Sequence, residues 1–192
     1  SLVCSLQGDA DAAERCARQG IAISQRLRSD FVESVGLMRL GHPFQLRGDH
    51  PWDAASPHRR QAITCYERAI EQVQAFRVIR TQVEPLWGLC RAYGYGGDLV
   101  SAERYAVKAV EIAQGAGDEW IADLVRVTMG ATYALHSRSE QAQEWLTEAV
   151  EGFRRVGDPF GRSVARLWLA LDAWNRGEIT TSLVYMSELL PL

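Results

Sequence analysis

The chain has 192 residues, of which 47% are hydrophobic and 23% charged, and its formal net charge is -3 at pH 7. This balance is typical of a folded globular protein and not of a disordered one. A weakly acidic chain lacks the basic surface expected of a nucleic-acid-binding protein, and no stretch of 18 uninterrupted apolar residues predicts a membrane-spanning helix.

The cysteines and the start of the chain bear on its location. The four cysteines are scattered without a C-x-x-C pair, so neither a disulfide framework nor a zinc site is expected. The first residues, "SLVCSLQGDADAAERC", lack the basic start and the apolar core of a signal peptide. We therefore expect a cytoplasmic location. A first residue other than Met also suggests a fragment of a larger protein.

Taken in chain order, the predicted elements are helices separated by glycine-containing turns. Residues 1–7 predict the end of a helix, and the next helix follows Gly8-Asp9. A further helix ends at Gly48, and an insertion at 49–58 with two prolines predicts a loop. The next helix begins at Ser56-Pro57 and is expected to run to about Arg80. Later helices end at the glycines Gly97, Gly117, Gly157 and Gly177.

An internal repeat with a period of forty residues links these elements. The repeat is marked by small residues at corresponding positions, Ala62, Ala102, Ala142 and Ser182, and seven residues later by Ala69, Ala109, Ala149 and Leu189. Each unit reads as two helices. The first helix of a unit carries a large apolar residue, then a small residue, and then an aromatic residue one helical turn later. Examples are "LGHPF", "LCRAY" and "MGATY". Since helix axes approach to about 8–10 Å only where side chains are small, the alanines are expected at helix contacts.

The pattern Leu89, Cys90, Tyr93, Gly97, followed by Ala102, Ala106 and Ala109, resembles the tetratricopeptide repeat family. The resemblance implies an all-α, right-handed superhelical solenoid of antiparallel helix pairs. It covers residues 1–192 as a single domain of about five units, the first and last incomplete. The family's usual proline is absent, and its usual period is about 34 residues. The longer units closed by Gly-Asp are similar to the repeats of MalT-like bacterial transcriptional regulators.

In that family the first helices of successive units line a groove that holds a peptide or protein partner. Matching the motifs residue by residue places these candidate partner-binding residues in the groove: His42, Gln45, Glu84, Trp87, Arg91, Tyr95 and Trp174. The same face includes Met38, Val127, Ala131, Leu135, Leu167 and Leu171. An alternative is that the aromatic residues at helical spacing are inter-helix core. Trp52 in the insertion is a candidate loop contact, or it packs back onto its own helix pair.

Motifs for chemistry are missing from the sequence. His42, Asp49, His50 and His58 lie close in sequence, but their spacing fits no metal-ligand motif. "YGYGGD" lacks the lysine of a phosphate-binding loop, and no nucleophile elbow is present. We expect no catalytic, cofactor-binding or metal-binding residues.

The leading hypothesis is a non-catalytic module for protein interaction or ligand sensing, within a larger bacterial signalling or transcriptional regulator. Expected partners are a protein or peptide, or neighbouring domains of the same chain, without direct contact to nucleic acid or membrane. A small-molecule effector could act on the repeats, and a homodimer could form through the apolar residues of the last helix, Leu183, Met186, Leu189 and Leu190. The alternatives are a self-standing peptide-binding adaptor or scaffold and an all-helical enzyme.

Overall fold

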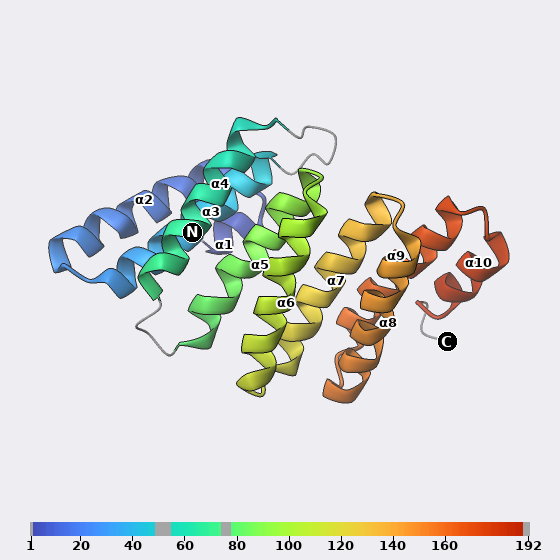
Figure 1. The fold of residues 1–192 in the computed structure, drawn as a ribbon. Coiled ribbons are helices and arrows are strands. Elements are labelled where there is room, and N and C mark those ends of the chain that lie inside the picture. Colours follow the sequence, from blue (N-terminus) through green and yellow to red (C-terminus); the bar gives the residue numbers. More distant parts are fainter. Residues whose placement is uncertain (1, 49–54, 74–77, 190–192) are drawn as a thin grey trace. The chain divides into compact units, whose positions relative to one another are not determined.

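The computed structural model describes residues 2–48, 55–73 and 78–189. These ranges contain helices and no strand. In chain order the helices are α1 (Leu2–Leu6), α2 (Ala10–Leu27), α3 (Asp30–Gly48), α4 (Pro57–Val73), α5 (Ile79–Tyr95), α6 (Leu99–Gly115), α7 (Glu119–Leu135), α8 (Ser139–Val156), α9 (Pro159–Asn175) and α10 (Ile179–Ser187). Helices that follow each other in the chain pack together from α1 to α5 and from α7 to α10 (Figure 1). The predicted all-α, solenoid-like helical repeat is confirmed.

The helices fall into two compact units. The first unit is Ser1–Ile112, in which α3 packs against α2, α4 and α5. The second unit is Ala113–Leu192, in which α9 packs against α7, α8 and α10. The boundary between the units lies inside α6. The prediction of one domain over the whole chain stays a prediction.

The Gly-Asp pairs end one helix and start the next. Gly157 follows the last residue of α8 with a φ of 73°, in the left-handed region that glycine adopts without strain. Asp158 is the N-cap of α9, where its Oδ1 accepts a hydrogen bond from the backbone N–H of Gly161 at 3.0 Å. Asp118 caps α7 in the same way, by accepting from Ile121. The turn signals read from the sequence are thus confirmed.

The repeated small residues lie at helix contacts. The alanines spaced by forty are fully buried, namely Ala62, Ala102 and Ala142, as are Ala69, Ala109 and Ala149. Ser182, the last member of the first series, is also buried, and its hydroxyl donates to the backbone oxygen of Ala170 at 2.9 Å. A small residue with a satisfied hydroxyl therefore replaces alanine there without leaving a buried polar atom unpaired.

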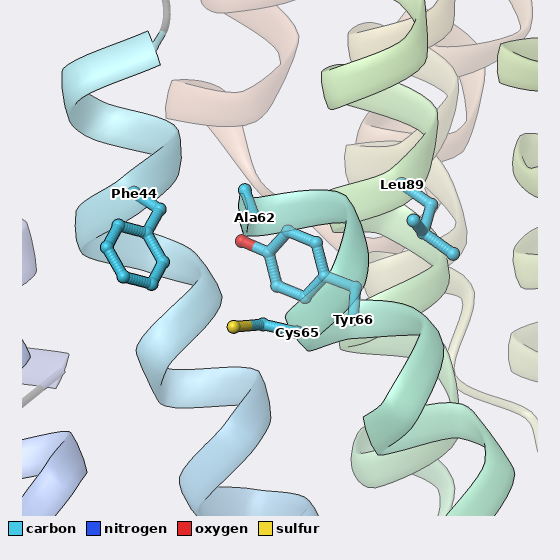
Figure 2. Close-up of a cluster of buried hydrophobic side chains, with 5 residues drawn as sticks. All are labelled: Phe44, Ala62, Cys65, Tyr66 and Leu89. Atoms are coloured by element: carbon cyan, nitrogen blue, oxygen red, sulfur yellow. The ribbon is translucent and has the colours of Figure 1, made fainter. Parts of the chain in front are cut away.

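Tyr66 on α4 defines the separation of α3 and α5 in the first unit. Its buried ring fills the space beside Gly41 of α3 and Gly88 of α5, and a Cβ at either glycine would collide with it. Its hydroxyl donates to Gln45 Oε1 at 2.6 Å. Figure 2 shows the ring between α3 and α5, within a cluster that also contains Phe44, Ala62, Cys65 and Leu89.

The connection between α4 and α5 differs from the prediction. The sequence predicted one helix from Ser56-Pro57 to about Arg80, but α4 ends at Val73 and Arg80 belongs to α5, which begins at Ile79. The start is as expected, since Pro57 is the first residue of α4, where its missing N–H costs no helical hydrogen bond. The apolar period continued through "QAFRVIR", so periodicity could not show the break.

Candidate functional site

Most of the predicted groove residues lie together on α3 and α5. This α3–α5 surface consists of Arg39, His42, Gln45, Glu84, Trp87, Arg91 and Tyr95. Within this set, Arg39 pairs with Glu84, and the charges of Arg39 and Arg91 act on His42. Met38, which the sequence also placed on this face, is buried. Arg39 was not predicted, although it lies one helical turn before His42 on α3, which was a usable signal.

An ion pair connects the two helices across this surface. Arg39 Nη1 on α3 lies 2.9 Å from Glu84 Oε2 on α5, and both side chains are mostly buried. Burying two charges costs desolvation free energy, and removing either partner would leave the other charge buried without a counter-charge. It therefore fixes the relative positions of α3 and α5 and leaves little net charge from these two groups.

His42 is a neutral imidazole in a positive environment. Burial, with the charges of Arg39 and Arg91, lowers its pKa to about 4. The guanidinium of Arg91 lies 5.4 Å from the centre of the Tyr95 ring, within cation–π distance. Gln45 Nε2 is a buried donor that makes no hydrogen bond with the described residues. This surface therefore combines a cation–π pair with one buried amide donor that lacks an acceptor.

A second surface, apolar in character, lies on α9 in the second unit. The α9 apolar face consists of Phe160, Val164, Leu167, Leu171 and Trp174. These residues follow spacings of four and three, which place them on one side of a helix. Phe160 is 78% exposed and Trp174 54% exposed, and Leu167 and Leu171 are also exposed. An apolar stripe along four turns of a helix is typical of a contact surface.

The sequence located only part of this face. Trp174, Leu167 and Leu171 were predicted there and are exposed. Phe160 was missed, although it lies one heptad before Leu167. The residues predicted on α7 behave differently, because Val127 and Ala131 are buried and offer almost no surface. Trp52, the predicted loop contact, lies outside the described residues.

The remaining candidates for chemistry are metal-binding side chains and cysteine thiols. Within residues 2–48, 55–73 and 78–189, no group of three or more His, Cys, Asp or Glu side chains could hold a metal ion. Burial raises the pKa of the Cys65 thiol to about 11 and that of Cys90 to about 12. Both thiols therefore stay protonated and unreactive at neutral pH. In the part of the chain that the structure describes, no helix is both long and apolar enough to cross a membrane.

Comparisons with known proteins define the fold and no more. No family model matches the chain, and no curated protein matches it. Among solved structures, the chain is similar to BtubC (BKLC) from P. vanneervenii, with a TM-score of 0.69 and 16% identity. The similarity covers 94% of this chain and 72% of BtubC. The chain therefore has a helical-repeat fold, shared with a protein of very different sequence.

Proposed function

We propose that the chain is a non-catalytic, partner-binding module of the tetratricopeptide type. The observation that carries this proposal is the α9 apolar face, with Trp174 and Phe160 more than half exposed at its ends. Exposing large aromatic side chains to water is unfavourable, and tryptophan is enriched among the residues that dominate binding energy. A partner that covers them gains the free energy of apolar burial.

The α3–α5 surface supports the proposal with a different chemistry. It offers a polar and aromatic contact surface, in which Arg91 and Tyr95 stack and Gln45 presents a buried donor. Residues of these types fix the register of a bound segment, while apolar contacts supply most of its affinity. Both surfaces lie on first helices of helix pairs, where the tetratricopeptide resemblance places its groove.

The cellular setting that we propose follows from the resemblance to MalT-like repeats. There the module belongs to a larger bacterial signalling or transcriptional regulator in the cytoplasm. A partner or effector that binds the repeats would bias the activity of neighbouring domains. Such coupling requires only that the ligand prefers one of two arrangements of the whole protein.

A direct test is to pan a displayed peptide library on the chain and to measure the selected peptides by fluorescence anisotropy. The Trp174→Ala variant should weaken binding by about tenfold or more, as expected for a hot-spot residue. Val156→Ala is a matched control, because Val156 is exposed on α8 of the same unit but lies outside the face. If no selected peptide is weakened by Trp174→Ala or by Arg91→Ala, neither surface binds partners and the proposal is wrong.

The self-standing adaptor is the second candidate, favoured by the charge of Arg91 near His42. Adaptors that clamp a chain end need cations for its carboxylate. Peptides with free and amidated C-termini distinguish the candidates. A strong preference for the free carboxylate, abolished by Arg91→Ala, supports the adaptor. Equal binding of both peptides favours the regulator module.

A further inference from the structure

A small hollow lies where α8 ends and α9 begins. Its volume is about 180 Å³, and its lining residues are Phe153, Arg154, Gly157, Asp158, Pro159 and Arg162. Sites for drug-sized ligands measure about 300–1,000 Å³, so only a smaller group fits here. The hollow lies entirely in the second unit.

Arg162 is the unusual member of this lining. Its side chain is partly buried, and its Nε is buried without a hydrogen-bond partner. Its guanidinium makes no hydrogen bond or ion pair with any residue that the structure describes. Because a buried N–H without an acceptor is costly, Arg162 Nε is expected to meet a hydrogen-bond acceptor.

The other charges of the hollow indicate what kind of anion fits. Arg154 adds a second guanidinium, whose Nε donates to Glu151 at 2.9 Å. Asp158 is a carboxylate, and the hydrogen bonds that it accepts from Gly161 and from Trp120 Nε1 keep it ionised. Because Glu151 pairs with Arg154, the charges of Arg162 and Asp158 balance each other and the four groups together carry no net charge. Asp158 would repel a phosphate dianion more strongly than a monoanion, and a guanidinium pairs well with a carboxylate.

The remaining lining is apolar. Phe153 and Pro159 belong to the lining, with Gly157 between them in sequence. A ligand of matching chemistry has a charged head and a short apolar body. We infer that the hollow between Arg154 and Arg162 binds a carboxylate group attached to a short aliphatic body. The carboxylate belongs either to a small organic acid or to the end of a peptide.

The inference is tested by titrating the whole chain with sodium butyrate and observing binding by isothermal calorimetry or ligand-detected NMR. Butyramide has the same shape without the charge, and it should bind at least tenfold more weakly. Arg162→Gln should weaken butyrate binding by about tenfold or more, since hydrogen bonds to charged groups contribute that much. Arg155→Gln is the matched control, because Arg155 is exposed on α8 and does not line the hollow. It should change binding less than twofold.

Several results would overturn the inference. Equal binding of butyramide, equal effects of the two arginine variants, or tighter binding of inorganic phosphate would each exclude a carboxylate site at Arg162. If Arg162→Gln does not fold, Arg154→Gln gives the same test on the other guanidinium. A short peptide ending in valine identifies the source of the carboxylate. If this peptide binds more tightly than butyrate, the ligand is a peptide end; if it binds more weakly, the ligand is a small organic acid. If the amidated peptide binds as tightly as the free one, the inference is overturned.

Discussion

The carboxylate of Asp123 on α7 occupies the space that a side chain at Gly152 on α8 would need. Asp123 is fully buried, and Arg126 Nη1 donates to its Oδ1 at 2.7 Å. Burial raises the pKa of this carboxyl, while the arginine opposes that shift. The helix pair can therefore close only because position 152 has no side chain.

We expect Gly152→Ala to lower the free energy of unfolding by about 1–3 kcal/mol, because the new methyl group must displace a buried, hydrogen-bonded carboxylate. Urea denaturation measures the change. Gly20→Ala is the control, since a Cβ there meets open space within α2. That variant should gain about 0.5–1 kcal/mol from helix propensity. Equal losses in both variants would show that Asp123 does not restrict position 152.

Ser137 has a φ of 55° at the place in its unit where Gly97 and Gly177 stand in theirs. A left-handed conformation costs a residue with a Cβ about 1–2 kcal/mol. Ser137→Gly should therefore raise the free energy of unfolding by roughly 1 kcal/mol, observable as an increased thermal midpoint. The reverse change, Gly97→Ser, should lower it by a similar amount. If Ser137→Gly destabilises the protein instead, the serine side chain contributes more than the strain costs.

The pKa of His42, lowered to about 4, predicts a pH-dependent stability. The ordinary value for histidine is about 6.5, so between these two pH values the unfolded chain takes up a proton that the folded chain refuses. Stability present above pH 6.5 is thus lost as the pH falls toward 4, by up to about 3 kcal/mol. His42→Gln should lose less stability over this interval. If the free energy of unfolding of the two proteins falls equally between pH 6.5 and 4, His42 takes up a proton in the folded protein as readily as in the unfolded chain. That result would contradict the prediction.

Leu169 and Leu171 on α9 form a matched pair, because Leu169 is buried and Leu171 belongs to the exposed α9 apolar face. Leu169→Ala should cost about 2–5 kcal/mol, from lost burial and the cavity left behind. Leu171→Ala and Trp174→Ala should each change stability by less than about 1 kcal/mol. Chemical denaturation of the three variants is the measurement. A large loss for Trp174→Ala would place that side chain in a packed core and remove the basis for the proposed partner surface.

Sequence periodicity predicted the repeated positions well, because helix contacts impose small residues directly. Ala62 and Ala102 could be identified as contact residues from spacing alone, and both are fully buried. The boundary between α4 and α5 could not be predicted, since no glycine marks the break after Val73. Periodicity also could not separate Val127, which is buried, from Leu167, which is exposed, because both occupy the same position in their repeats.

The amino-acid sequence by itself determined the helices, their Gly-Asp turns and the faces on which alanines meet, because these depend on local backbone preference and on side-chain size. Only the tertiary structure decided that Arg39 pairs with Glu84, that Asp123 requires Gly152, and that Arg162 lies unpaired beside a hollow. The physical reason is that each of these relationships involves groups on different helices or at helix ends. Its geometry therefore depends on how closely those helices pack.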